Sequence, residues 1–258
     1  MSTPVDLSGR VVIVTGASRG IGKGLAIGLA GLGASVVCAA RSEHTAPGGM
    51  PGTIHETAQA ITDAGGQAIA LRCDIGRAEE ITALVDATVE QFGRLDVLVN
   101  NAMAPSSVLF DDSDVDQWDE SMRINVRSLY LFARAVVPIM ARTGGGSIVN
   151  ISSAGAEHAT TPFMPPGSLF YSVAKAALER FTSALAPEIR SAGVTVNALR
   201  PGAVRTEMTA EEFGPDHDWS GWSTPESVVG PVATLAAQID TDFTGKILDV
   251  SGFGKTWG

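Results

Sequence analysis

Short runs of apolar residues alternate along this chain with longer stretches in which apolar residues recur at helical spacing. The runs are nearly continuous and rich in β-branched residues, and they cover residues 11–14, 36–40, 68–71, 95–99, 148–151, 195–199 and 247–250. Such unbroken runs are typical of strands that are covered on both faces. The helical spacing is clearest over residues 21–32, 81–92, 118–140 and 174–189. This alternation predicts an α/β fold of the doubly wound, Rossmann type, with a seven-stranded parallel sheet and helices on both faces.

Two segments interrupt the alternation. Residues 45–53 contain three glycines and two prolines, and residues 157–170 contain three prolines and a glycine, so both are predicted to be loops. Neither loop separates regions of different composition, and α/β folds of about 250 residues often form one domain. We therefore expect residues 1–258 to form a single domain.

Charge and cysteine content narrow the possible functions. The 258 residues include 18 Lys and Arg against 28 Asp and Glu, a net charge of −10, with no basic run. A nucleic-acid binder or a basic membrane-surface helix needs clustered positive charge, so both are excluded. No apolar run approaches the roughly 20 residues that span a bilayer, and no signal peptide is visible at the N-terminus. Cys38 and Cys73 lie in apolar stretches, which favours buried thiols and a cytoplasmic location.

A glycine-rich segment follows the first predicted strand and leads directly into a helical pattern. Its sequence is Thr15-Gly16-Ala17-Ser18-Arg19-Gly20-Ile21-Gly22. Glycines at a strand-to-helix turn let a pyrophosphate approach the backbone, and the helix N-terminus offers it unpaired N–H groups. The spacing differs from G-x-G-x-x-G, but the context on both sides predicts dinucleotide binding.

The end of the second predicted strand indicates which dinucleotide is bound. NAD sites carry an acidic residue there, about 20 residues past the glycines, to bind the ribose 2′-hydroxyl. Here the chain has Ala40 followed by Arg41, and Arg19 lies within the glycine turn. Because arginine pairs with a phosphate, we predict that NADP(H) is preferred, with NAD(H) possible. The alternative is that Arg41 is simply solvated, and the nearby Glu43 complicates the prediction.

Tyr171 and Lys175 stand four residues apart in a predicted helix, so both lie on one helix face. A nearby ammonium group favours the phenolate and lowers the pKa of a tyrosine below its usual value of about 10. A tyrosine tuned in this way can exchange a proton with a carbonyl or alcohol oxygen. By itself such a pair is more often ordinary helix surface, but beside a dinucleotide turn it predicts a hydride-transfer site.

These motifs together resemble the short-chain dehydrogenase/reductase family, in its short, single-domain branch. The resemblance covers essentially the whole chain and is carried by residues 15–22, Asn100-Asn101-Ala102, Ser153, Tyr171 with Lys175, and Pro201-Gly202. It implies a catalytic set in which Tyr171 is the acid/base and Lys175 lowers its pKa and holds the nicotinamide ribose. Ser153 would hydrogen-bond the substrate oxygen, and Asn125 would support a proton relay to the lysine.

The resemblance also implies a set of cofactor contacts. Besides Tyr171 and Lys175, these are Gly16, Ser18, Arg19, Gly20, Ile21, Gly22, Arg41, Asp74, Ile75, Asn101, Ala102, Pro201, Gly202, Val204 and Thr206. Within this set Asp74 would hold the adenine, although an Asp after a strand is as often a helix cap. The stretch from Pro201 to Thr206 would clamp the carboxamide and the pyrophosphate.

Three departures from the family pattern stand out. Met103 occupies a position that is usually glycine, and the last predicted strand is followed by Ser251-Gly252 in place of an Asp-Gly-Gly turn. Ser153 and Tyr171 lie 18 positions apart, which is farther than usual, and the excess falls in the proline-rich loop. The geometry of that loop is therefore in doubt, while every catalytic group is retained.

Other kinds of site find little support. The four histidines show no metal-ligand spacing, so no metal is predicted. His158, in the proline-rich loop, is a candidate for facing the substrate.

In this family the substrate pocket is built from variable loops, here about 157–170 and 203–222. These loops carry Phe163, Met164, Phe170, Met208, Phe213, Trp219 and Trp222. Pockets are mostly apolar, so we expect a small hydrophobic alcohol, ketone or aldehyde as the substrate. The same residues are equally consistent with packing of the loops themselves.

The leading hypothesis is an NADP(H)-dependent oxidoreductase acting on CH–OH and C=O groups. The alternatives are a catalytically idle, dinucleotide-sensing protein on the same fold, an NAD(H)-preferring alcohol dehydrogenase, or a dehydratase or epimerase. The resemblance further implies a homotetramer or homodimer formed through helices near residues 114–142 and 171–192.

Overall fold

Seven parallel strands form one sheet in the order β3-β2-β1-β4-β5-β6-β7. A computed structural model describes residues 5–45, 49–104, 107–157 and 164–258. The strands are β1 (Val11–Thr15), β2 (Ser35–Ala40), β3 (Gln67–Arg72), β4 (Val97–Asn100), β5 (Gly146–Ile151), β6 (Val194–Arg200) and β7 (Ile247–Asp249). Each predicted strand is found within two residues of its expected ends, so the predicted Rossmann-type sheet is confirmed.

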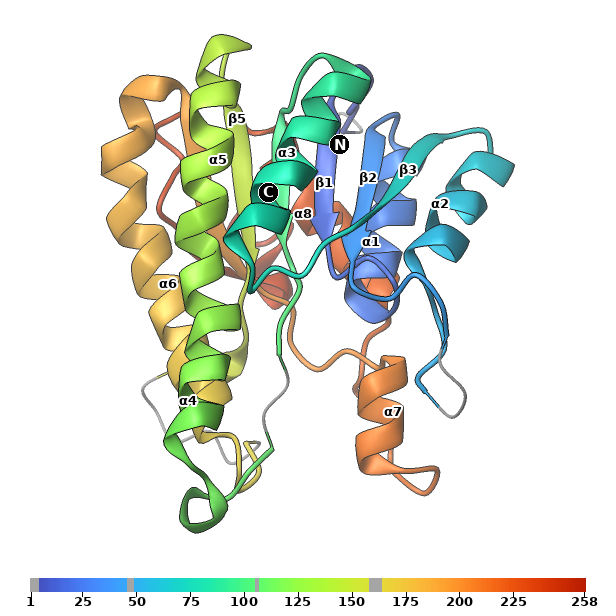
Figure 1. The fold of residues 1–258 in the computed structure, drawn as a ribbon, viewed down its shortest axis with the longest axis vertical. Helices are drawn as coiled ribbons and strands as arrows, with labels where there is room; N and C mark the ends of the chain where they lie inside the picture. Colours follow the sequence, from blue (N-terminus) through green and yellow to red (C-terminus); the bar gives the residue numbers. More distant parts are fainter. Residues whose placement is uncertain (1–4, 46–48, 105–106, 158–163) are drawn as a thin grey trace.

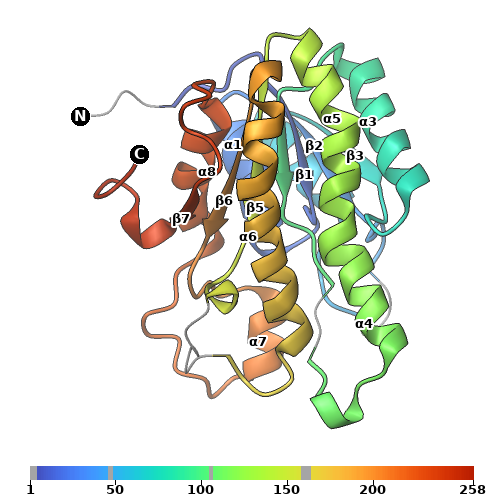
Figure 2. The same cartoon turned by 90° about the vertical axis from the view of Figure 1, so that its left-hand side faces the viewer.

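Helices cover both faces of the sheet, which explains why the strands are apolar throughout (Figures 1 and 2). One face packs against α1 (Gly20–Gly31), α2 (Ile54–Asp63) and α8 (Val229–Ala237). The other packs against α3 (Ala78–Phe92), α5 (Ser128–Arg142) and α6 (Leu169–Ile189). Within β1, Val12 and Val14 enter the first core and Val11 and Ile13 the second, because successive side chains of a strand point to opposite faces.

The helix predicted over residues 118–140 is continuous from α4 (Val115–Met122) into α5 but contains a π-helical turn, η2 (Arg123–Arg127). By length and composition, Val115–Arg142 would be long enough to cross a membrane, which corrects the expectation that no segment is. It is apolar because Leu129, Phe132 and Met140 pack into the protein core. Core helices of globular proteins pass the same test, so this helix by itself is only weak evidence for a membrane span.

Two expected loops contain helical structure. Residues 169 and 170, assigned to the proline-rich loop, form the first turn of α6. The segment 203–222 contains α7 (Glu207–Phe213), which begins with a capping box between Thr206 and Thr209. None of its residues is fully buried, so it shows no apolar periodicity, and the sequence pattern missed it for that reason.

Candidate active site

The turn after β1 is tied to the end of the neighbouring strand β4. The Thr15 hydroxyl donates a hydrogen bond to the Val99 carbonyl at 3.2 Å, and its oxygen accepts from the backbone N–H groups of Asn101 and Ala102, each at 3.0 Å. The carboxyl ends of parallel strands meet at one edge of a sheet, so residues 85 positions apart lie together. This contact places the predicted residues Asn101 and Ala102 beside the glycine turn.

The glycines of the turn are required by its shape. Gly16 has φ = +70°, a conformation that favours glycine. A side chain at Gly22 would overlap the Gly16 carbonyl and the Asn101 amide. Asn101 Nδ2 also donates to the Thr15 carbonyl at 2.9 Å. The backbone is thus folded closely on itself, as a phosphate-binding turn requires.

An anionic oxygen already lies at the N-terminus of α1. The Gly20 N–H donates to a Glu207 carboxylate oxygen at 2.9 Å. The predicted contact Thr206 lies beside it, since a Cβ on Gly20 would come within 3.3 Å of the Thr206 methyl group. Helix N-termini attract anions, and the carboxylate shows that this N–H is directed at one. The turn therefore fits a pyrophosphate. The sequence reasoning missed Glu207, although it directly follows the predicted Thr206.

The side chain of Arg19 reaches from the glycine turn to Ser42, just after β2. A 2′-phosphate would need positive charge at this place. The Arg19 guanidinium donates to the carbonyls of Pro51 (2.9 Å), Gly52 (3.0 Å) and Met50 (3.3 Å) and to the Ser42 hydroxyl (3.4 Å). These partners are all uncharged, so they hold the side chain without neutralising it.

The two other charged residues of this region have separate surroundings. Arg41 is exposed and precedes Ser42. Glu43, which complicated the cofactor prediction, lies 3.5 Å from His55 and 4.0 Å from Arg72. Its carboxylate thus has other partners.

Asp74 and Ile75 have local structural contacts. The Asp74 carboxylate accepts from the Gly76 N–H at 2.9 Å, and Ile75 packs into the core on the α3 side of the sheet. The Asp74 carboxylate therefore holds a turn; the N-cap of α3 is Arg77, so the helix-cap alternative for Asp74 is not found, and its adenine contact stays a prediction.

The segment after β6 runs beside the glycine turn. Pro201 is buried, Gly202 has φ = +77°, and buried Val204 bridges to Ser223. Its final residue, Thr206, caps α7. Figure 1 shows α7 below the carboxyl ends of the strands, on the opposite side from α4 and the start of α6.

Three of the four predicted catalytic residues come together at the end of β5. Ser153 follows the strand, and its hydroxyl lies close enough to Tyr171 to lower the pKa of the phenol. Lys175 Nζ lies 5.7 Å from the centre of the Tyr171 ring, on the same face of α6, and donates to the Ile151 carbonyl at 2.7 Å. A hydroxyl, a phenol and an ammonium group therefore meet at the same edge of the sheet as the glycine turn, with β4 between β1 and β5.

The pKa of Tyr171 differs from the sequence-based expectation. Burial raises it above its ordinary value of 10, the hydrogen bond with Ser153 lowers it, and the charge of Glu212 raises it. We expected Lys175 to bring it down, but the net shift is upward because the phenol is largely desolvated. Burial also lowers the pKa of Lys175 from 10.5 to about 8, and the charge of Glu179 raises it.

The fourth predicted catalytic residue, Asn125, lies in the π-helical turn, which packs against α6. Its side chain holds the segment after β4: Oδ1 accepts from the Ala104 N–H at 2.8 Å, and Nδ2 donates to the Ala104 carbonyl at 3.1 Å and to the Ser121 hydroxyl at 3.2 Å. Its role in a proton relay stays a prediction. π-Helical turns frequently occur at functional sites.

The apolar residues expected in the substrate loops have different environments. Met164 lies beside Gly155 and close to the Tyr171 ring. Phe170 is buried with its ring edge-on to Trp118, their centroids 5.3 Å apart. His158 and Phe163 lie outside the described residues.

A second group of apolar side chains packs on itself after α7. The rings of Phe213, His217, Trp219 and Trp222 pack edge-on or tilted against one another, and the Arg205 guanidinium lies 4.9 Å from the centre of the Trp219 ring. This favours the loop-packing interpretation for these aromatic residues, whereas Met164 lies near Tyr171.

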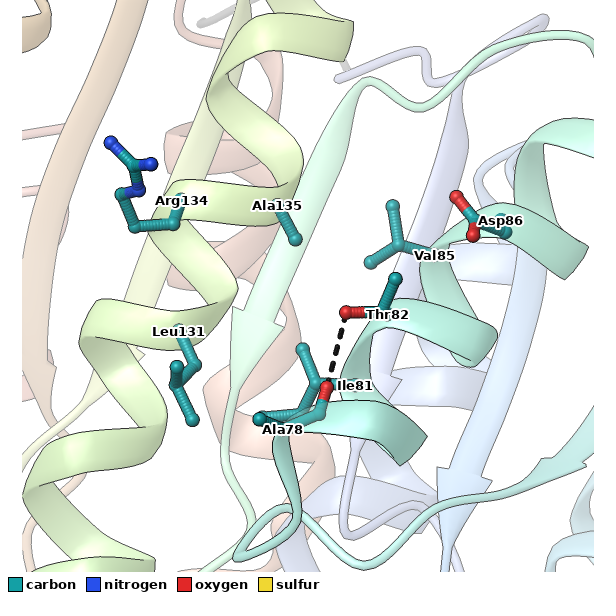
Figure 3. A pocket seen from close by; sticks show the side chains of 8 residues that line it. All are labelled: Ala78, Ile81, Thr82, Val85, Asp86, Leu131, Arg134 and Ala135. Carbon is teal, nitrogen blue, oxygen red and sulfur yellow. Dashed lines mark hydrogen bonds between the residues drawn. The ribbon is translucent and has the colours of Figure 1, made fainter.

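A separate hollow of about 320 Å³ lies between α3 and α5. Figure 3 shows Ile81 and Val85 facing Leu131 and Ala135 across it. It contains no predicted site residue. Within the described part of the chain, no group of three or more His, Cys, Asp or Glu side chains is arranged to hold a metal ion.

The comparison with protein families agrees with this geometry. The profile of the short chain dehydrogenase family matches residues 10–216, a span that runs from β1 to beyond α7. The chain belongs to the short-chain dehydrogenase/reductase family. Members of this family are nicotinamide-dependent oxidoreductases that act on CH–OH and C=O groups.

Several individual proteins are similar over nearly the whole chain. A 3-oxoacyl-[acyl-carrier-protein] reductase from Synechocystis is 35% identical, covering 95% of this chain and 97% of its own. A 3beta-hydroxysteroid dehydrogenase 1 from Eggerthella lenta is 32% identical, covering 96% and 94%. The crystal structure of a putative NAD(P)-dependent gluconate 5-dehydrogenase from Beutenbergia cavernae, with bound NADP at low occupancy, has a TM-score of 0.83 at 31% identity and covers 97% and 99%.

The buried Lys175 ammonium predicts a pH-dependent stability difference. Its pKa is about 8 in the folded protein and 10.5 in the unfolded chain, so the unfolded state binds more protons between these values. Wild type should therefore gain stability relative to Lys175→Met as the pH rises from 8 to 10.5, by about 3 kcal/mol at 1.4 kcal/mol per pKa unit. Urea unfolding across this range measures the difference. A difference that stays constant with pH would contradict the prediction.

We expect the Glu207 carboxylate to compete with a cofactor phosphate for the Gly20 N–H. Glu207→Gln should lower the Kd for NADPH by about threefold to tenfold, because an anion at a helix N-terminus contributes roughly 1 kcal/mol. Fluorescence titration of NADPH measures the change. Glu211→Gln is the matched control, since Glu211 lines the same 400 Å³ hollow with Glu207 and no hydrogen bond from it to the described part of the turn is found. Equal Kd values for the two variants would argue against competition.

Proposed function

We propose that this short-chain dehydrogenase/reductase is an NADP(H)-dependent enzyme that moves a hydride between the nicotinamide and a hydrophobic alcohol, ketone or aldehyde. The observation that carries the proposal is the meeting of Ser153, Tyr171 and Lys175 at the end of β5, at the same edge of the sheet as the turn after β1. Each group is of the kind that the reaction needs at the substrate oxygen.

The proposed roles follow from the chemistry of each side chain. The bound nicotinamide supplies or accepts the hydride. Tyr171 exchanges the proton with the substrate oxygen, and the Ser153 hydroxyl donates a hydrogen bond to the same oxygen as negative charge develops on it. Lys175 brings positive charge next to the phenol and favours its deprotonation. Asn125 is the fourth proposed catalytic residue, and its proposed role is to support a proton relay to Lys175.

The preference for NADP(H) is supported by the charges near the end of β2. Arg19 is held by uncharged partners, Arg41 is exposed, and the Glu43 carboxylate lies beside His55 and Arg72. A 2′-phosphate placed there would meet two guanidinium groups, which bind phosphate well. The related gluconate 5-dehydrogenase has NADP bound, which agrees with this choice.

A hydrophobic substrate is supported by Met164, whose side chain lies near Tyr171. The relative from Eggerthella is named for a hydroxysteroid, which is largely apolar. We further propose a cytoplasmic protein, because Cys38 and Cys73 are buried and unpaired, and a homodimer or homotetramer formed through α5 and α6. Tyr130 and Val173 leave apolar surface on these two helices that a second copy would cover.

A substrate screen with NADPH and NADH tests the proposed reaction. Carbonyl compounds of increasing apolar size should be reduced, with loss of the NADPH absorbance. Tyr171→Phe should lower kcat by about 10²- to 10⁴-fold, because it removes the proton donor, while NADPH should still bind through the remaining cofactor contacts. Tight NADPH binding without turnover of any alcohol, ketone or aldehyde would instead favour a dinucleotide sensor.

The cofactor preference predicts a selective effect of two arginines. Arg19→Ala or Arg41→Ala should each lower kcat/KM with NADPH by about 10- to 100-fold, because hydrogen bonds to charged groups contribute roughly 1.5–3 kcal/mol. With NADH the change should stay within about threefold. Arg41→Ala is the sharper test, because Arg19 also holds the loop at Pro51. Arg180→Ala, on the exposed side of α6, is the control. Equal losses with both cofactors would rule out a 2′-phosphate contact.

A further inference from the structure

An ion pair lies directly behind the candidate active site and takes no part in the proposed reaction. Arg200, the last residue of β6, donates to both oxygens of the Glu179 carboxylate on α6, at 2.7 and 2.8 Å. Their side chains are only 15% and 12% exposed. A paired contact of this kind fixes geometry as well as charge.

The same carboxylate holds the end of β5. The Ser152 hydroxyl donates to Glu179 at 2.6 Å, and one helix turn earlier Lys175 donates to the Ile151 carbonyl at 2.7 Å. Residues four apart on α6 thus hold the last residue of β5 and the residue that follows it, directly before Ser153. Figure 2 shows α6 running in front of β5 and β6.

Arg200 also contacts the proline-rich loop and the end of β7. It contacts Glu157, the first residue of the proline-rich loop, at 2.6 Å, and lies 4.0 Å from Asp249 at the end of β7. The next residue along the chain is Pro201, where the proposed cofactor segment begins. One guanidinium thereby joins the ends of β6 and β7, the base of the loop and α6.

We propose that Glu179, held by Arg200, is a positioning residue that keeps the end of β5 against α6 so that the Ser153 hydroxyl stays within hydrogen-bond reach of Tyr171. The proposal rests on the proposed function in one respect, namely that Ser153 and Tyr171 act on the same substrate oxygen. Beyond Tyr171, the contact found for the Ser153 hydroxyl in the described structure is the Gly155 N–H, which donates to it at 3.1 Å.

The energetics favour a geometric role over a stabilising one. A buried ion pair contributes little net stability compared with apolar residues of the same size, because both charges are desolvated. A catalytic group displaced by about 1 Å, by contrast, can slow a reaction by roughly 100-fold. The effect of the Glu179–Arg200 pair on the position of Ser153 is therefore more important than its contribution to stability.

The first test is turnover by Glu179→Gln, Ser152→Ala and the double variant. Each single change should lower kcat by about 10-fold or more with KM changed little. The double variant should lose no more than the worse single variant, because both changes break one linkage. Glu188→Gln, the same substitution at an exposed position of α6, is the matched control. Ser152→Ala leaves the Glu179–Arg200 pair intact, so it remains informative if Glu179→Gln folds poorly. Unchanged kcat in both single variants, or additive losses, would overturn the proposal.

The second test needs no turnover. The chain has two tyrosines, so in a Tyr130→Phe background the absorbance of tyrosinate reports on Tyr171 alone. Among the described residues, the groups found to act on Tyr171 are the Ser153 hydroxyl, the Lys175 ammonium near its ring and the charge of Glu212. Because the bond with Ser153 lowers the pKa of Tyr171, displacing Ser153 should raise the titration midpoint in Glu179→Gln and Ser152→Ala but not in Glu188→Gln.

The two tests separate the two proposals. A raised midpoint in a protein that turns over no alcohol, ketone or aldehyde would support the positioning role and refute the proposed function. An unmoved midpoint in both variants of an active enzyme would refute the positioning role and leave the proposed function standing.

Discussion

All seven strands run in the same direction, and the rest of the structure depends on this constraint. The carboxyl ends of parallel strands lie at one edge of the sheet, so the residues that follow β1, β4, β5 and β6 become neighbours. The Thr15 hydroxyl bound to the chain at Asn101, and the Thr206 side chain against Gly20, are direct results. A cofactor turn and a reaction site can then share one edge although nearly 190 residues separate Gly20 from Glu207.

Charge is distributed so that each buried ionic group has a defined partner. Lys175 is fully inside the protein with the Ile151 carbonyl as its acceptor, and burial brings its pKa to about 8. Glu179 and Arg200 compensate one another one helix turn away. At the turn after β1, by contrast, Arg19 keeps its charge among carbonyl groups, and the Gly20 N–H is matched by the carboxylate of Glu207. The chain as a whole has a net charge of −10, so the positive charge of Arg19 at this edge is a local exception.

Much of the fold and of the candidate site could be predicted from the sequence. The unbroken apolar runs marked the strands because both faces of the sheet are covered, and the spacing of Tyr171 and Lys175 put both on one face of α6. The turn after β1 was recognisable because its glycines are set by local backbone geometry, as the positive φ of Gly16 shows. Short elements with exposed surfaces were not predictable, and α7 is the example, because its residues are too little buried to leave an apolar pattern.

The sequence by itself thus determined the parallel α/β sheet, the glycine turn and the placement of Tyr171 and Lys175 on one helix face, since each depends on burial or on neighbours close along the chain. Tertiary structure alone decided the direction of the Tyr171 pKa shift, because desolvation depends on what packs over the phenol. It also decided the partners of Glu179, Arg200 and Glu207. Those contacts join residues from 21 to 187 positions apart, and no local pattern records which distant side chains a charge will meet.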